Sequence, residues 1–154
     1  LILRPWEEKD AAALYEYARD PRVGPAAGWP PHTNVENSLE IIRGVLSAPE
    51  TYAVVLKSLG EPVGSAGIMF PGKGHAPMAE HDPEAVRALL ARCFEELGCE
   101  AVWCGYYDGN DKSRRVQEKC GFLYHHTERE LPTPLGDIRT EHFTRLTRER
   151  WRSL

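Results

Sequence analysis

Residues 110–122 read Asn-Asp-Lys-Ser-Arg-Arg-Val-Gln-Glu-Lys-Cys-Gly-Phe, and the rest of the chain is interpreted outward from this stretch. It follows residues 101–107, a nearly unbroken apolar and aromatic run that is typical of a buried strand. Residues 108–111 are rich in Asp, Gly and Asn, which favours a turn, and a short helix is expected to about Lys119. The stretch therefore predicts a buried strand, an asparagine turn and a short helix in immediate succession.

An amphipathic helix is predicted just before that strand. It opens at Pro83, a residue favoured in the first helical turn, and Gly98 ends it. Its apolar residues recur at the spacing of one helical face: they are Ala85, Val86, Leu89, Leu90, Cys93, Phe94 and Leu97.

Strands and helices are also predicted on both sides of this centre, with no internal repeat and no linker. On the N-terminal side we expect a strand over 1–6, a helix over 7–20, an irregular loop over 24–31 around Trp29, a helix capped by Thr33 or Asn34 that continues to Leu46, and an antiparallel hairpin of strands 52–56 and 62–69. On the C-terminal side we expect strands over 122–127 and 138–146. Mixed strands and helices with an antiparallel tail indicate a single α/β (α+β) domain over residues 1–154.

Composition narrows the classes of partner. The formal net charge of −4 gives no global basic field, which argues against nucleic acid as the main partner. No apolar run approaches the roughly 20 residues that span a bilayer, and the first residues, Leu1 to Arg4, are too short for a secretory signal. We therefore expect no membrane partner and a cytoplasmic location.

The cysteines and histidines show no metal-binding spacing. Cys93, Cys99, Cys104 and Cys120 form no Cys-x-x-Cys pair, so buried reduced thiols are expected. His125 and His126 are adjacent in a predicted strand, which would point them to opposite faces, with one facing the core. We therefore expect no metal.

The Asn110-to-Phe122 stretch resembles the Asn-x-x-(Ala/Ser)…Lys-x-Gly-Phe signature of the GNAT N-acetyltransferase superfamily. The order of elements is similar over nearly the whole chain, and the RimJ/RimL branch matches most closely. The resemblance implies the GNAT fold, a mixed central sheet with splayed parallel strands flanked by helices. It also implies acetyl-CoA as cosubstrate and an amine, such as a protein N-terminus or a small molecule, as acceptor.

The resemblance also implies which residues contact the cofactor. Asn110, Ser113, Arg114, Pro83 and Tyr106 are expected to bind acetyl-CoA, with Ser113 as the acid that assists departure of the CoA thiolate. From the residues alone, a helix-entry role is favoured for Asn110, and Ser113 is equally an ordinary serine in a first helical turn. Arg114 is a candidate for the 3′-phosphate of CoA, with a solvated helix face as the alternative.

The sequence does not settle which groups act as the catalytic acid and the catalytic base. Many relatives carry a tyrosine acid four residues after Ser113, where this chain has Gln117, so serine or water must replace it. The base that deprotonates the acceptor amine is sought among Glu36, Glu40 and Glu80, and the sequence does not choose among them.

The chain departs from the family between Asp82 and Pro83. There the family has a bulged strand and a glycine-rich turn whose backbone amides grip the pyrophosphate at a helix N-terminus. Either this chain has lost both, or the residues that form them are missing from the sequence in hand. We favour the second explanation, since a central strand is rarely dispensable.

The expected reaction is direct attack of a neutral amine on the thioester in a ternary complex. No Gly-x-Ser-x-Gly motif suggests a covalent intermediate. The rival interpretation is a catalytically silent acyl-CoA-binding or regulatory domain. The sequence does not identify the acceptor substrate, because the first helical pair and the Trp29 loop, which set substrate specificity, vary freely in such folds. A homodimer is left open.

Overall fold

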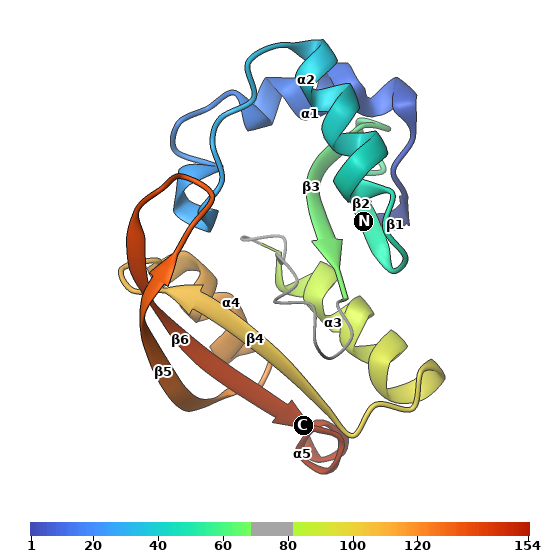
Figure 1. Cartoon of the computed structure of the whole chain (residues 1–154). Helices are drawn as coiled ribbons and strands as arrows, with labels where there is room; N and C mark the ends of the chain where they lie inside the picture. Colours follow the sequence, from blue (N-terminus) through green and yellow to red (C-terminus); the bar gives the residue numbers. More distant parts are fainter. Residues whose placement is uncertain (69–81) are drawn as a thin grey trace.

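The computed structural model describes residues 1–68 and 82–154 and contains strands, α-helices and short 3-10 or π turns. In chain order these are β1 (Ile2–Pro5), η1 (Glu8–Asp10), α1 (Ala11–Ala18), η2 (Pro25–Ala27), α2 (Val35–Ile41), η3 (Ile42–Leu46), β2 (Thr51–Val55), β3 (Pro62–Gly67), α3 (Pro83–Ala91), η4 (Arg92–Glu96), β4 (Ala101–Tyr107), α4 (Asp111–Lys119), β5 (Leu123–Pro132), β6 (Ile138–Thr147) and α5 (Arg148–Ser153). Figure 1 shows this order by colour.

The first sheet is antiparallel, with strand order β1-β2-β3, as the predicted hairpin requires. Successive side chains of β2 point to opposite faces. Ala53 and Val55 pack with Trp6, Ala11 and Ile42 on the side of α1 and α2, while Val54 packs toward α3. Helices therefore cover both faces of this sheet, and Figure 1 shows α1 and α2 together above it.

Helix α3 joins the first sheet to the second. Ala85 and Leu89 belong to a cluster with Val54 and Ala66 of the first sheet. The neighbouring stripe is formed by Val86 and Leu90 of α3 and Phe94 of η4. It packs against residues of the C-terminal half: Cys104, Val116, Cys120, Phe122 and Leu146. The wide apolar face predicted for this helix thus divides between two cores, which explains why so much of its surface is apolar.

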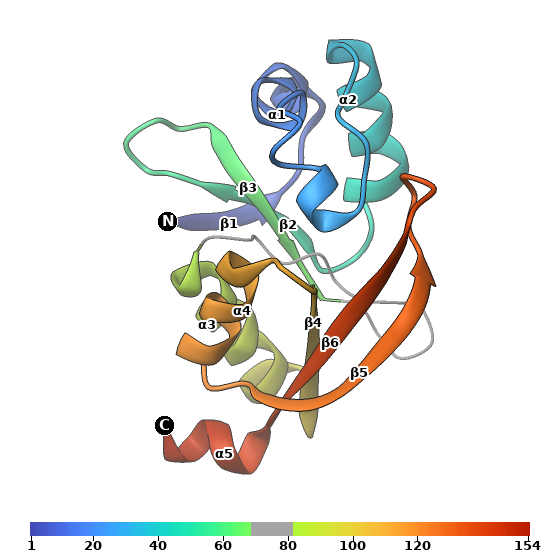
Figure 2. The ribbon, with the colours of Figure 1, turned by 90° about the vertical axis from the view of Figure 1, so that its left-hand side faces the viewer.

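The second sheet has the strand order β4-β6-β5, and both of its pairings are antiparallel. One face packs on α3 and α4, which lie together on the same side of β4 (Figure 2). The expectation that β4 is a buried strand is wrong: only Cys104 in it is fully buried, and Trp103 is 45% exposed. The apolar run suggested burial on both faces of β4, but only alternate residues of the strand pack against the helices.

Other element predictions are confirmed with small changes. Asn34, not Thr33, caps α2, and its side chain accepts a hydrogen bond from the amide of Asn37 (2.7 Å). The strand β5 runs to Pro132, longer than predicted, and the terminal helix α5 was not predicted. The end of the strand predicted over 62–69 and the loop that follows it lie outside the described residues.

The mixed α/β fold class is confirmed. Among residues 1–68 and 82–154, all strand pairings are antiparallel, so the expected splayed parallel pair does not appear as a hydrogen-bonded ladder there. Within the same ranges, none of the helices is both long enough and apolar enough to cross a membrane.

Candidate active site

The strand β4 has one edge without a strand partner among the described residues, because it pairs with β6 alone. The amide of Asp108 donates to the carbonyl of Thr140 (2.9 Å), and such bonded positions alternate along an antiparallel pair. Trp103, Gly105 and Tyr107 therefore turn their backbone groups to the free edge. This edge can accept an extended ligand as an additional strand.

Asn110 lies at the end of this edge and caps α4. Its side-chain oxygen accepts from the amide of Ser113 (3.2 Å), and its Nδ2 donates to the carbonyl of Ala26 (3.4 Å). The helix-entry role is therefore present in the structure. The bond to Ala26 adds a tie between α4 and the loop that precedes α2.

Ser113 belongs to a buried polar network built around Gln117. The Gln117 side chain is fully buried, and its Nε2 donates to Ser113 Oγ (3.2 Å) and to the carbonyl of Gly105 (3.0 Å). Its Oε1 accepts from Thr144 Oγ1 (2.7 Å). Because an amide NH₂ only donates, Ser113 Oγ accepts in this bond and its own proton is directed elsewhere. Gln117, at the position where the family often has tyrosine, thus orients Ser113.

Arg114 and Tyr106 lie beside this network. Arg114 forms ion pairs with Asp111 (3.5 Å) and Glu118 (3.9 Å), so carboxylates of its own helix share its charge. Tyr106 contacts the ring of His142 (5.2 Å between centroids), and burial raises the pKa of its hydroxyl. Both side chains lie near the start of α4, but neither is bonded to Ser113 or Asn110.

Pro83 lies farther away, at the start of α3. Its carbonyl accepts from Cys120 Sγ (3.7 Å), and Cys120 lies seven residues beyond Ser113, about 10 Å along the helix axis at the usual rise per residue. The first turn of α3 carries acidic groups: the Asp82 carboxylate accepts from the amide of Glu84 (2.9 Å). Pro83 has no N–H to donate. Two carboxylates therefore lie at this helix start, and one of them already accepts from the amide of Glu84.

A hollow of about 650 Å³ opens beside Asn110 and is lined by residues 107–112, Arg22, Ala26 and Arg139. The Trp29 loop forms one wall, since Arg139 Nη1 donates to the carbonyl of Pro25 (2.7 Å). The guanidinium of Arg139 also lies over the Tyr107 ring, 5.0 Å from its centroid. The Trp29 loop, which is expected to influence the choice of acceptor, thus lies against the end of β4.

Glu141 was not among the sequence candidates. It is 8% exposed, and its carboxylate forms no hydrogen bond or ion pair with another residue of 1–68 or 82–154. Burial, and next the nearby Glu128 carboxylate, raise its pKa to about 7. A Cβ on residue 105 would overlap the Glu141 carboxylate, so Gly105 leaves the space that this side chain fills. An isolated glycine in an apolar strand was the only signal of such a close approach.

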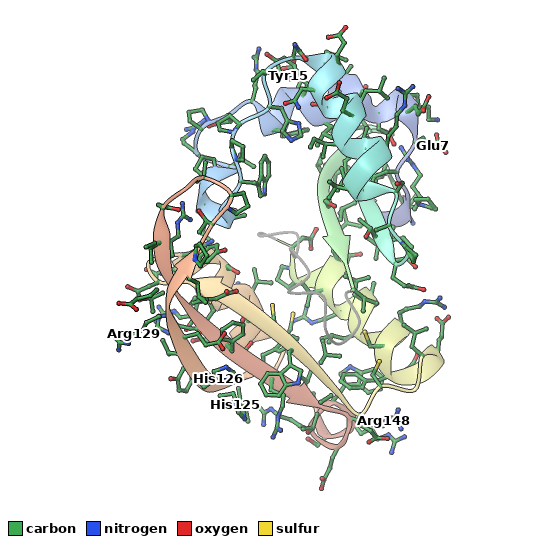
Figure 3. All side chains as sticks on the ribbon, viewed as in Figure 1. Glu7, Tyr15, His125, His126, Arg129 and Arg148 are labelled. Atoms are coloured by element: carbon green, nitrogen blue, oxygen red, sulfur yellow. The ribbon has the colours of Figure 1, made fainter. Side chains whose placement is uncertain are left out.

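The predicted arrangement of the adjacent histidines is correct only in part. A register shift between Tyr124 and His126 is the mark of a bulge, which breaks the alternation of side chains. His125 and His126 therefore lie side by side on β5 with their Nδ1 atoms 2.8 Å apart (Figure 3). His126 is the less exposed of the two and stacks on the buried Phe143 ring, 4.8 Å between centroids, as expected of a histidine that faces the core. In the part of the chain that the structure describes, no three His, Cys, Asp or Glu gather as metal ligands.

The remaining predictions have mixed outcomes. All four cysteines are free, and Cys93, Cys104 and Cys120 are buried, as expected. Glu36 and Glu40 are exposed on α2, and Glu80 lies outside the described residues.

Comparison with known proteins identifies relatives. A family model described as an acetyltransferase (GNAT) domain matches residues 1–123. No curated protein matches the sequence. A GNAT-family acetyltransferase of Bacillus anthracis has a similar structure, with a TM-score of 0.79 and 20% identity over 96% of this chain and 94% of that one.

Two other similar structures have more specific names. A ribosomal-protein-S5-alanine acetyltransferase of Vibrio fischeri has a TM-score of 0.71 and 18% identity over 97% of this chain and 93% of that one. A chimeric spermidine N-acetyltransferase from Vibrio cholerae has a TM-score of 0.71 and 15% identity over the full length of both chains. At these identities the likeness shows a shared fold.

Proposed function

Because the chain belongs to the GNAT acetyltransferase family, we propose that it transfers an acetyl group from acetyl-CoA to a primary amine. The observation that carries this proposal is the free edge of β4 next to the Asn110–Ser113–Gln117 network. Acetyl-CoA supplies an activated acetyl group as a thioester. The chain's own groups bind it, orient it and handle protons.

The free edge fits the amides of the pantetheine arm. The amides of Gly105 and Tyr107 face this edge, and the carbonyls of both residues are already bonded, to Gln117 Nε2 and to the amide of Asn110. The edge therefore offers mainly donors, and carbonyl oxygens of an extended ligand are their natural partners. Asn110 stands where that ligand passes the start of α4.

Ser113 is the proposed acid. Its Oγ is held by Gln117 while its proton remains available, which suits a donor to the thiolate that forms as the C–S bond breaks. No covalent enzyme intermediate is required, since a neutral amine attacks the thioester directly. The acceptor enters from the hollow beside the Trp29 loop.

An amine acceptor is favoured by the relatives. The names of two similar structures specify alanine of a ribosomal protein and spermidine, and both acceptors carry amines. The proposed assignment is an N-acetyltransferase acting in a ternary complex, with RimJ/RimL-like acceptors, a cytoplasmic location and no metal. The proposed domain spans residues 1–154.

The test is calorimetry with CoA, followed by a screen of peptides and small amines for CoA release from acetyl-CoA. We expect saturable CoA binding and release that depends on a primary amine. If the folded protein does not bind CoA at millimolar concentration, the proposed acetyltransferase function is excluded.

A second candidate function, a catalytically silent acyl-CoA-binding domain, is favoured by the start of α3. Asp82 and Glu84 place carboxylates where the family binds pyrophosphate, and the glycine-rich turn is absent from the sequence between Asp82 and Pro83. CoA binding without release for any amine would support this candidate. The intact mass of the natural protein tells whether residues are missing at this junction.

A further inference from the structure

Glu141 and Ser113 lie on opposite sides of one glycine of β4. On one side, Gln117 Nε2 connects Ser113 Oγ (3.2 Å) to the carbonyl of Gly105 (3.0 Å). On the other side, the Glu141 carboxylate fills the space where residue 105 lacks a side chain. The network on the α4 side and the carboxylate on the opposite face therefore meet at Gly105, which turns its amide to the free edge.

The Glu141 carboxylate lies in a setting that does not favour its charge. Its side chain is 8% exposed and has no bonded partner among the described residues. Its cross-strand neighbours are Tyr107 of β4 and Glu128 of β5. Cys104 lies within electrostatic range, and Arg139, which precedes Glu141 on the same strand, is already bound to Asp137 (2.8 Å) and to the carbonyl of Pro25.

These groups have a defined effect on protonation. Burial and the Glu128 charge raise the pKa of Glu141 to about 7, close to the pH at which a base is most effective. Burial and the Glu141 charge in turn raise the pKa of Tyr107, so the phenol stays neutral. An unpaired, desolvated carboxylate near neutrality is unusual for a purely structural position.

We propose that Glu141 is the general base that accepts a proton from the acceptor amine, a role that rests on the proposed function. The acceptor enters as an ammonium ion and transfers one proton to the Glu141 carboxylate. Its freed lone pair attacks the thioester carbon, a C–N bond forms and the C–S bond breaks. As the C–S bond breaks, the CoA thiolate takes the proton of the Ser113 hydroxyl. The second proton of the attacking nitrogen restores that hydroxyl through water, and Glu141 later releases the first proton to solvent.

The test compares Glu141→Gln with Glu128→Gln in the full chain, using an amine found active in the screen. Positioned general bases contribute about 100- to 10,000-fold, so Glu141→Gln should lower kcat/KM by about 100-fold or more while CoA affinity from calorimetry is unchanged. The wild-type kcat/KM should rise with pH and level off above about 7.

Glu128→Gln is the matched control, because it removes one cross-strand carboxylate and leaves Glu141 in place. It should keep the plateau value of kcat/KM and move the rising limb of the pH profile to lower pH. If Glu141 had only a structural role, Glu128→Gln would not shift the rising limb of the pH profile.

Each outcome decides the proposal. Full activity of Glu141→Gln overturns it, and so does a rising limb that Glu128→Gln leaves in place. If Glu141→Gln is poorly folded by circular dichroism, the limb in Glu128→Gln decides alone. A wild-type protein that binds CoA but acetylates no amine overturns the proposed function, and this role with it.

Discussion

At the scale of single residues, Asn110 combines two roles that substitutions can separate. Its side-chain oxygen caps α4 and its Nδ2 bonds Ala26, so an effect of truncation on ligand binding is mixed with an effect on folding. The Nδ2 donor and the oxygen that caps α4 belong to the same side chain. Replacement by aspartate, which has the same shape, therefore removes the donor and keeps the cap.

Asn110→Ala should weaken CoA binding several-fold and also destabilise the fold by about 0.5–2 kcal/mol, the usual cost of a lost N-cap. Asn110→Asp keeps an oxygen for the amide of Ser113 and removes the NH₂ donor. It should therefore keep the helix cap, with a melting temperature lowered only by the loss of the Nδ2 bond to Ala26, and should lose affinity in calorimetry. Equal CoA affinity in all three proteins would leave Asn110 with the capping role alone.

Ser113→Ala removes one hydroxyl at nearly constant size. A well-placed donor to developing charge is worth about 2.7–4 kcal/mol, so kcat should fall about 100-fold or more with little change in CoA affinity. Ser113→Thr keeps a hydroxyl and serves as the control in steady-state kinetics. An unchanged kcat in Ser113→Ala would return the acid's role to solvent, and a tenfold loss would point to a proton relayed by water.

Glu141 should also make stability depend on pH. Its pKa is raised in the folded state from 4.5 to about 7, so its contribution to stability is fully present below 4.5 and is lost as pH rises through 7. Glu141→Gln abolishes that loss and should be more stable than wild type at pH 8, by up to about 3 kcal/mol. Urea unfolding at pH 5 and pH 8 measures this. If the difference in unfolding free energy between Glu141→Gln and wild type is the same at pH 5 and pH 8, this prediction is wrong.

At the scale of elements, a buried polar network ties α4 to the second sheet. Gln117 of α4 donates to the carbonyl of Gly105 in β4 and accepts from the hydroxyl of Thr144 in β6. The same hydroxyl lies 3.3 Å from the carbonyl of Cys104, the weaker of its two contacts. Such a network specifies how the helix is seated on the strands.

Gln117→Leu should destabilise the protein by about 1–3 kcal/mol, because it leaves buried groups without partners. It should also reduce kcat, since Ser113 loses the group that orients it. Adding Thr144→Val removes one orphaned hydroxyl, so the double variant should be less destabilised than the sum of the single variants. Additive losses in urea unfolding would show that the network is not cooperative.

At the scale of the whole molecule, α3 makes the two sheets one folding unit. Leu89 packs toward the first sheet and Leu90 toward the second, and both side chains are buried. The two sheets share no strand pairing among the described residues, and this helix packs against both of them.

Leu89→Ala and Leu90→Ala should each lower the free energy of unfolding by about 2–5 kcal/mol. Each variant should unfold in one transition, because the helix is shared. Far-UV circular dichroism and tryptophan fluorescence should coincide, with Trp6 reporting on the first core and Trp151 on the second. Leu59→Ala, at an exposed hairpin position, is the control. Two separate transitions would show that the halves unfold independently.

The sequence by itself determined the order of elements up to β6, the starts of α3 and α4, and the α/β class. These follow from local chemistry: the helical spacing of apolar residues, Pro83 at the helix start and the Asn110 turn. The motif from Asn110 to Phe122 also indicated the family. Ser113 and Asn110 were identified because they lie within that local motif.

Only the tertiary structure decided what surrounds those residues. The role of Gln117 as a link, the approach of Glu141 to Gly105 and the pairing of the two histidines depend on strand register. Register joins Gly105 to Phe143 and Tyr107 to Glu141 across long sequence separations, and no local pattern encodes those distances. The exposure of β4 has the same origin, because burial depends on which elements pack on a strand as well as on its own side chains.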